Sequence, residues 1–244
     1  MRRRRLLIDA GNSTLKWAVI EAGQWRAQGR CDYADWTGLK GELTAGIDCL
    51  IASVTDPVRE QQIAALLDEL EITPTWLKAG AGFADLKNTY LNPQQLGVDR
   101  WMALIAARQR THEPVLVVSA GTAMTVDALS ADGVFLGGVI VPGVTLMRQA
   151  LRRGTAQIAD AAGEWQAFPC TTADAVQSGI VAALCGAIQL QHARLAATAG
   201  TAPRCLLTGG DSEMLLPHVG LPAEHVPDLI LEGLDRVARE GESR

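Results

Sequence analysis

Residues 9–16 bring together side chains that suit phosphate binding. The segment includes Asp9, Gly11, Ser13 and Lys16 and follows a short apolar run. Glycine lets the backbone turn tightly, and the N–H groups of such a turn form a concavity that binds anions. The Ser13 hydroxyl and the Lys16 ammonium suit the same phosphate, and Asp9 suits Mg²⁺ held largely through water. The same residues would also suit a hairpin whose polar side chains only cap the turn.

A second turn of the same kind occurs 110 positions further along the chain. Gly121 and Gly133 follow Gly11 and Gly23 at this spacing, and each pair separates apolar, strand-like runs. Thr122 is the hydroxyl-bearing residue of the second turn. Two related turns facing one another across a cleft would clamp a polyphosphate. A Walker A loop and a Rossmann site are disfavoured, because neither turn ends in Gly-Lys-Ser/Thr and no G-x-G-x-x-G follows a strand.

Residues 97–100, Gly-Val-Asp-Arg, form a third candidate site ahead of a predicted helix. Asp99 could accept a proton from a substrate hydroxyl, and Arg100 could pair with a substrate carboxylate through two hydrogen bonds. Phosphoryl transfer needs such a base beside clamped phosphates and a metal ion. The alternative is structural, because aspartate is also favoured at the start of a helix, where it opposes the helix dipole.

The elements around these motifs predict an α/β protein. Apolar runs between glycine turns predict strands, and apolar residues at helical spacing predict helices. The expected strands cover residues 6–9, 17–21, 24–28, 48–54, 75–77, 115–120, 125–129, 134–136 and 204–208. The expected helices cover residues 57–70, 99–110, 172–197 and 227–239, with a break near Gly186 in the third. Each half opens with a β-meander and continues with helix–strand crossovers, the pattern of a sheet covered by helices.

We place the boundary between the halves at residue 112, which gives domains 1–112 and 113–244 with a cleft between them. The second half also carries two glycine-rich segments, 137–143 and 209–211. Their glycines would let a flat ring such as adenine approach the backbone closely, although each is also typical of a simple turn.

Composition excludes several other classes of protein. The 244 residues carry a net charge of −5 and are 48% hydrophobic, so the chain lacks the basic excess of nucleic-acid-binding proteins. No run reaches the ~20 apolar residues that span a bilayer, and residues 6–8 are too few for a signal peptide. Five scattered cysteines argue against a disulfide framework or a zinc site, and we expect a cytoplasmic protein. We expect Ser119, Ser178 and Ser212 to lack a nearby His/Asp partner, and none lies in a G-x-S-x-G elbow, which disfavours a serine hydrolase.

Five motifs in the same order resemble those of type III pantothenate kinases. They are DAGNSTLK at 9–16, GVDR at 97–100, GTAMTVD at 121–127, GGVIVPG at 137–143 and TTADAVQSG at 171–179. The resemblance covers essentially the whole chain. It implies two tandem RNase H-like domains, as in actin, sugar kinases and heat-shock ATPases. It also implies ATP-dependent phosphorylation of pantothenate at its primary hydroxyl, the first step of coenzyme A synthesis.

The resemblance assigns roles to particular residues. ATP would be bound by Thr122 and by the whole first turn, Asp9, Ala10, Gly11, Asn12, Ser13, Thr14, Leu15 and Lys16. Pantothenate would contact Tyr90, Gly97, Val98, Asp99, Arg100 and Thr172. Asp99 would be the general base, and Asp9 would hold Mg²⁺ through water. The family pattern further implies a homodimer, and we expect neither a nucleic-acid nor a membrane partner.

The chain departs from the family pattern at three positions. Ser119 stands where the family often has an aspartate that binds a monovalent cation, so a requirement for K⁺ or NH₄⁺ stays open. Ser13 replaces the usual Thr and keeps the hydroxyl, and Thr171 replaces the usual Asn. Two other functions remain, a nucleotide-binding regulator without turnover and another small-molecule kinase of the same superfamily. The presence of Asp99 and Arg100 favours a kinase that acts on a hydroxy acid.

Overall fold

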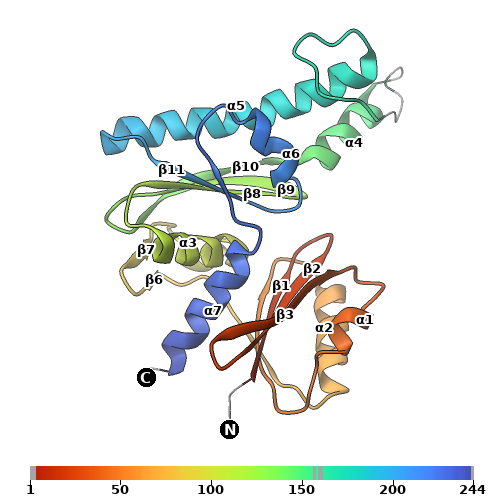
Figure 1. Cartoon of the computed structure of the whole chain (residues 1–244), viewed down its shortest axis with the longest axis vertical. Coiled ribbons are helices and arrows are strands. Elements are labelled where there is room, and N and C mark those ends of the chain that lie inside the picture. Colours follow the sequence, from red (N-terminus) through yellow and green to blue (C-terminus); the bar gives the residue numbers. More distant parts are fainter. Residues whose placement is uncertain (1–3, 156–157, 159–161, 243–244) are drawn as a thin grey trace. The chain divides into compact units, whose positions relative to one another are not determined.

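The computed structural model describes residues 4–155, 158 and 162–242, which form two compact units (Figure 1). Within the described residues, the first unit takes 4–84, 90–109 and 228–242, and the second takes 85–89 and the remainder of 110–227. Both units carry candidate site residues, so each is described by itself.

A five-stranded sheet forms the centre of the first unit. Its strands are β1 (Arg4–Ala10), β2 (Leu15–Glu21), β3 (Gln24–Cys31), β4 (Asp48–Ser53) and β5 (Pro74–Trp76), in the order β3-β2-β1-β4-β5. Strands β1, β2 and β3 form an antiparallel meander, whereas β4 runs parallel to β1 and β5 parallel to β4. Leu6 and Ile8 of β1 are fully buried in a core on one face. Because side chains alternate along a strand, Asp9 lies on the opposite face.

Helices cover both faces of this sheet. On the face of Leu6, α1 (Thr37–Lys40) and α2 (Pro57–Asp68) supply core side chains, and α2 begins after Asp56, whose carboxylate accepts two N–H groups of its first turn. On the face of Asp9, α7 (Leu229–Glu242) contacts β1, β2 and β4. Helix α3 (Val98–Arg110), preceded by the 3₁₀ helix η1 (Pro93–Gln95), approaches α7 so closely that a Cβ on Gly233 would overlap the backbone of Met102.

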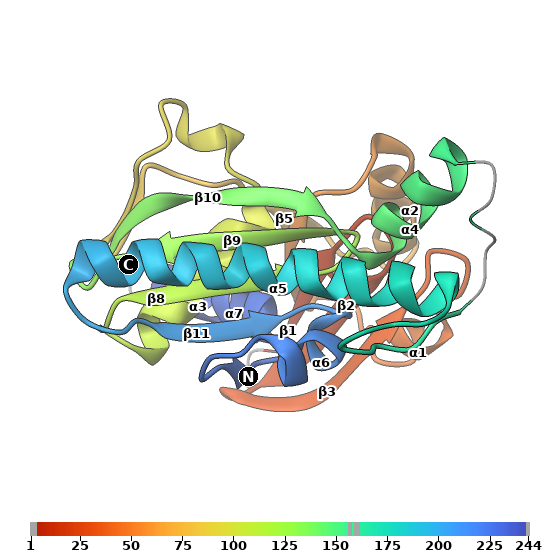
Figure 2. The same ribbon diagram turned by 90° about the horizontal axis from the view of Figure 1, so that it is seen from above.

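A second, seven-stranded sheet has the order β12-β11-β8-β9-β10-β7-β6. Its strands are β6 (Gly82–Phe83), β7 (Leu86–Asn88), β8 (Val115–Ala120), β9 (Ala123–Leu129), β10 (Val134–Pro142), β11 (Arg204–Thr208) and β12 (Glu224–His225). The helices of this unit are α4 (Val144–Gly154), α5 (Thr172–Ala199), α6 (Ser212–Leu215) and the 3₁₀ helix η2 (Leu216–His218). Figure 2 shows α5 lying along one face of strands β8 to β11.

The two sheets share one topology, which confirms the duplicated α/β fold predicted from the 110-residue repeat. The orders β3-β2-β1-β4-β5 and β10-β9-β8-β11-β12 correspond strand by strand. In both, a three-stranded meander is followed by strands parallel to its first strand. The C-terminal helix α7 nevertheless packs on the first sheet, although residues 228–244 were assigned to the second half. The boundary between the two repeats at residue 112 stays a prediction.

Helix α5 runs for 28 residues without interruption, so the predicted break near Gly186 was wrong. An internal glycine costs about 1 kcal/mol relative to alanine. Burial of Ile180, Leu184 and Ile188 in the core of the second sheet offsets that cost. Among the described residues, α5 is also the one helix long and apolar enough to span a membrane. Its length and composition are only weak evidence for a membrane span, because a buried core helix can be equally long and apolar.

Candidate active site

Asp9 and Lys16 face each other at the base of the first turn. They are partners in the antiparallel ladder of β1 and β2, so both side chains lie on the same face of the sheet. The Gly11 N–H donates to the Thr14 carbonyl at 3.1 Å and closes the turn. Asn12 and Ser13 are exposed at its tip. The structure thus combines a carboxylate, an ammonium group and an exposed backbone turn in one place.

Three side chains from other parts of the first unit hold this turn, and sequence reasoning missed them. They are Arg30 on β3, Tyr33 just after β3 and Arg59 on α2. Each donates a hydrogen bond to an atom of residues 11–14, at 3.2, 2.6 and 2.6 Å respectively. The hairpin register, which pairs Arg30 with Lys16, could have pointed to the first. The other two are brought to the turn by tertiary packing and carry no local signal.

Asp99, Arg100 and Tyr90 lie together at the start of α3. Helix α3 begins one residue earlier than predicted, so Asp99 and Arg100 fall in its first turn. Arg100 is only 5% exposed, and its Nη1 donates to the Tyr90 phenol oxygen at 3.0 Å. The Asp99 Oδ1 accepts the Arg100 backbone N–H at 2.8 Å. Three residues predicted to contact one substrate therefore share one corner of the first unit.

The carboxyl groups of Asp9 and Asp99 are close enough to interact electrostatically. The pKa of Asp9 is raised from 3.8 to about 7, first by burial and then by the charge of Asp99, while the Lys16 ammonium opposes the shift. Helices α3 and α7 pack together, and α7 covers the face of the sheet that carries Asp9. The predicted metal ligand and the predicted base, far apart in sequence, thus meet in one site. Carboxyl groups with a shifted pKa and a charged neighbour are typical of functional sites.

Backbone from both glycine-rich segments closes around the second turn. The Gly143 N–H donates to the Thr122 carbonyl at 2.9 Å, and a Cβ on Gly143 would overlap the Gly121 carbonyl oxygen. Gly209 has a φ of +97°, and a Cβ there would overlap the backbone of Ala120. Both positions therefore require glycine, and the two segments predicted for the adenosine side meet at this turn.

Ser119 has hydroxyl-bearing residues beside it on both neighbouring strands. It pairs with Thr125 on β9 and with Thr208 on β11. The Thr125 Oγ1 is buried and has no hydrogen-bond partner within the part of the chain that the structure describes. Neither strand partner of Ser119 is a carboxylate.

Thr172 is the exposed first residue of α5, in the second unit. The preceding Thr171 caps the helix, because its Oγ1 accepts the Asp174 N–H at 3.1 Å and donates to the Asp174 carboxylate at 2.7 Å. Thr171 is therefore the N-terminal cap of α5. The contact of Thr172 with pantothenate stays a prediction.

Ser212 and His225 form a pair that the sequence did not indicate. Their Oγ and Nε2 atoms are 2.9 Å apart, and the Ser212 hydroxyl also donates to the Gly209 carbonyl at 2.6 Å. The prediction that Ser212 lacks a histidine partner was wrong, because β12 returns the chain beside β11. Since Ser212 is fully buried and donates its proton to Gly209, the pair stabilises the glycine turn and is not placed to act as a nucleophile.

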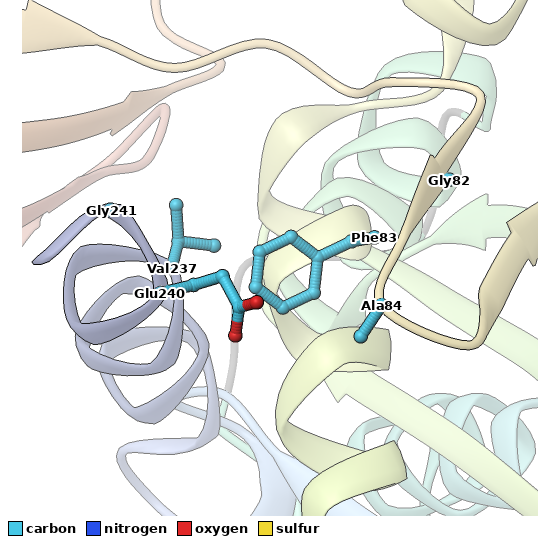
Figure 3. A pocket seen from close by; sticks show the side chains of 6 residues that line it. All are labelled: Gly82, Phe83, Ala84, Val237, Glu240 and Gly241. Atoms are coloured by element: carbon cyan, nitrogen blue, oxygen red, sulfur yellow. The ribbon is translucent and has the colours of Figure 1, made fainter. Parts of the chain in front are cut away.

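A hollow of about 480 Å³ lies apart from these residues in the first unit, where Phe83 and Glu240 point toward one another (Figure 3). It is lined by Gly82, Phe83, Ala84, Val237, Glu240 and Gly241. None of the predicted site residues lines it. Over the described ranges, no three His, Cys, Asp or Glu side chains are grouped to hold a metal ion.

Comparison with known proteins decides between the kinase and its alternatives. The family model for type III pantothenate kinase matches residues 5–194. The chain belongs to the type III pantothenate kinase family. A type III pantothenate kinase from Thiobacillus denitrificans is 61% identical over 237 residues, which cover 97% of each protein. The chain is therefore a pantothenate kinase of the third type, which phosphorylates pantothenate with ATP in the first step of coenzyme A biosynthesis.

Solved structures agree with the fold. A Baf family protein from Campylobacter jejuni has a TM-score of 0.66 at 22% identity and covers 98% of this chain and 100% of its own. MreB5 of Spiroplasma citri bound to ADP has a TM-score of 0.52 at 9% identity, with coverage of 98% and 97%. At these identities the likeness shows the fold alone, which is the duplicated α/β fold of actin-like ATPases and sugar kinases.

Proposed function

We propose that Asp99 is the general base of the kinase reaction. One observation carries this proposal, the interacting Asp9 and Asp99 carboxyl groups beside Lys16. Asp99 accepts the proton of the primary hydroxyl of pantothenate while the hydroxyl oxygen attacks the γ-phosphorus of ATP and ADP leaves. A carboxylate beside a phosphate-binding turn is placed to take a proton from a hydroxyl group bound there.

We assign the ATP phosphates to residues 9–16 and to Thr122. The exposed tip of the first turn and the Lys16 ammonium offer backbone N–H groups and a positive charge to phosphate oxygens. At the second turn, Gly143 and Gly209 leave the backbone without side chains, which suits close approach by a nucleotide.

The residues at Asp9 fit a magnesium ion. Mg²⁺ usually takes one or two carboxylates and keeps water and substrate phosphates as its other ligands. The Asp9 and Asp99 carboxyl groups repel one another, and burial disfavours the charged form of Asp9, so a divalent cation would stabilise the charged pair. Asp9 would hold the ion, largely through water. When bound, Mg²⁺ neutralises negative charge on the ATP phosphates.

We propose that Arg100 binds the carboxylate of pantothenate. The guanidinium group is buried beside Tyr90, where a charge-assisted hydrogen bond is stronger than in open solvent. A carboxylate anchor one residue from the base sets which hydroxyl of the substrate reaches Asp99. We propose Tyr90, Gly97, Val98 and Thr172 as further contacts with pantothenate.

Replacing Arg100 by methionine tests this assignment. We expect the Arg100→Met variant to raise the KM for pantothenate about 10- to 100-fold, the effect of losing a hydrogen bond to a charged group, with the KM for ATP nearly unchanged. Arg100→Lys keeps the charge but not the planar pair of donors, so its KM for pantothenate should lie between those of the wild type and Arg100→Met. Steady-state kinetics on protein of confirmed fold measures both constants. An unchanged KM for pantothenate in folded Arg100→Met would refute the assignment.

We also propose a cytoplasmic homodimer without nucleic-acid or membrane partners. Apolar side chains are exposed on β10 and α4, at Leu136, Ile140, Leu146 and Leu151. Exposed apolar side chains of this kind suit burial against a second copy of the chain. The net charge of −5 gives no basic excess for binding nucleic acid.

We propose that dependence on K⁺ or NH₄⁺ is weak. Ser119 supplies a neutral oxygen where a carboxylate would attract a cation strongly, and its strand partners Thr125 and Thr208 are neutral as well.

A further inference from the structure

Two side chains grip consecutive carbonyl groups of the first turn. The Tyr33 hydroxyl donates to the Gly11 carbonyl at 2.6 Å, and the Arg59 Nη1 donates to the Asn12 carbonyl at 2.6 Å. Both donors are far from the turn in sequence, one following β3 and the other lying on α2. These contacts fix the orientation of two neighbouring peptide groups.

Two other carbonyl groups of the turn also accept hydrogen bonds. The Val54 N–H donates to the Ala10 carbonyl at 3.1 Å, and the Gly11 N–H donates to the Thr14 carbonyl at the same distance. Four of the five carbonyl groups of residues 10–14 therefore accept a hydrogen bond from the protein itself. A carbonyl oxygen carries partial negative charge, so a phosphate-binding turn must keep its carbonyls directed away from the ligand.

The orientation of the carbonyls also sets that of the N–H groups. In a planar trans peptide the C=O of one residue and the N–H of the next point in opposite directions. The Asn12 N–H is therefore directed away from Tyr33, and the Ser13 N–H away from Arg59. Asn12 and Ser13 are both exposed at the tip of the turn.

We propose that Tyr33 and Arg59 are positioning residues for the ATP phosphates. They hold the Gly11 and Asn12 carbonyls away from the ligand and thereby present the N–H groups of Asn12 and Ser13 to a phosphate oxygen. The inference rests on the proposed function, in which the first turn binds the phosphates of ATP, and it names the residues that give the turn its polarity.

Both positioning residues are themselves held in place. The Tyr33 ring makes an edge contact with Trp36 at 5.9 Å between ring centroids, and the Trp36 indole N–H donates to the Tyr33 carbonyl at 3.0 Å. The Arg59 guanidinium lies 4.9 Å from the Tyr33 ring centroid and pairs with Asp56 at 3.1 Å. Because Asp56 offsets the charge of Arg59, this arginine acts mainly as a hydrogen-bond donor to the turn.

The test compares the binding of a nucleotide with that of its nucleoside. Calorimetric titrations with MgATP and with adenosine, without pantothenate, give two dissociation constants for each variant. We expect Tyr33→Phe to weaken ATP binding about 5-fold and Arg59→Met about 10-fold, as for a lost hydrogen bond, while adenosine binding is unchanged. The KM for ATP should rise in parallel, with the KM for pantothenate unaffected.

Two further variants serve as controls. Arg26→Met removes an exposed arginine of the same unit that pairs with Glu21, and it should leave both dissociation constants unchanged. Arg59→Lys keeps a donor at the position and should recover most of the ATP affinity. Tyr33→Phe removes no charge, so its effect separates orientation of the turn from direct attraction between Arg59 and phosphate.

Each outcome has a definite meaning. An equal loss of ATP and adenosine affinity, or ATP binding unchanged in folded Tyr33→Phe, would overturn the positioning role and leave the phosphate-binding turn in place. If the wild-type protein bound ATP no more tightly than adenosine, the assignment of the phosphates to the first turn would fail. The positioning role of Tyr33 and Arg59 would then fail as well.

Discussion

The Asp99→Asn variant should fold, bind MgATP and lose most of its turnover. Asparagine keeps the size of the side chain and can still accept the Arg100 N–H at 2.8 Å, but it cannot take a proton from the substrate hydroxyl. General bases typically contribute about 10²–10⁴-fold to the rate, so kcat should fall by that factor. The KM for ATP should change little, because the proposed phosphate contacts are made by residues 9–16 and Thr122 and not by Asp99. Steady-state kinetics with both substrates varied measures kcat, the KM for ATP and the KM for pantothenate.

A matched control keeps this result interpretable. Asp68→Asn makes the same chemical change at an exposed position at the end of α2 in the same unit, and it should keep wild-type kinetics. Near wild-type kcat in folded Asp99→Asn would remove Asp99 from the role of base.

The Asp9→Asn variant should lose activity and gain stability at neutral pH. Loss of the carboxylate removes the proposed magnesium ligand, so kcat/KM for MgATP should fall at least about 100-fold, as for other charge-stabilising groups. The stability effect follows from the pKa of Asp9, which folding raises from its ordinary value of 3.8 to about 7. Between these values the folded state binds more protons than the unfolded state, so stability falls as pH rises through that window.

The variant lacks this titration, so its advantage over the wild type should grow with pH. Between pH 5 and pH 8 the difference in unfolding free energy should increase by about 1–3 kcal/mol, less than the full shift because Asp9 is partly reached by solvent. Urea unfolding of both proteins at each pH measures it, without nucleotide or metal. A difference that stays constant over that range would contradict the raised pKa of Asp9.

Much of the fold could be predicted because its signals are local. The strands of both meanders lie between glycine turns, and the 110-residue repeat relates the three strands β1, β2 and β3 to the three strands β8, β9 and β10. Short elements were missed, since two-residue strands such as β6 and β12 exist only through their partners in the sheet. The break predicted at Gly186 failed because the buried face of α5 outweighs one poor helix former.

The residues of the candidate site also fall into those with a local sequence signal and those placed only by tertiary packing. Asp9, Lys16, Asp99 and Arg100 were found because each lies in a recognisable local pattern of turn or helix start. Tyr33 and Arg59 were not found, since their contacts with the first turn depend on where β3 ends and where α2 packs. The chemical groups of this site are thus visible in the sequence, whereas the groups that orient them appear only once the chain is folded.

The most direct test of the account is ADP release by the purified chain with MgATP, measured with and without pantothenate, first in the presence of K⁺ and then in its absence. The account predicts ADP release that requires pantothenate, matches the phosphorylated product mole for mole and changes little when K⁺ is omitted. Folded protein that releases ADP without pantothenate, or releases none under any of these conditions, would contradict it.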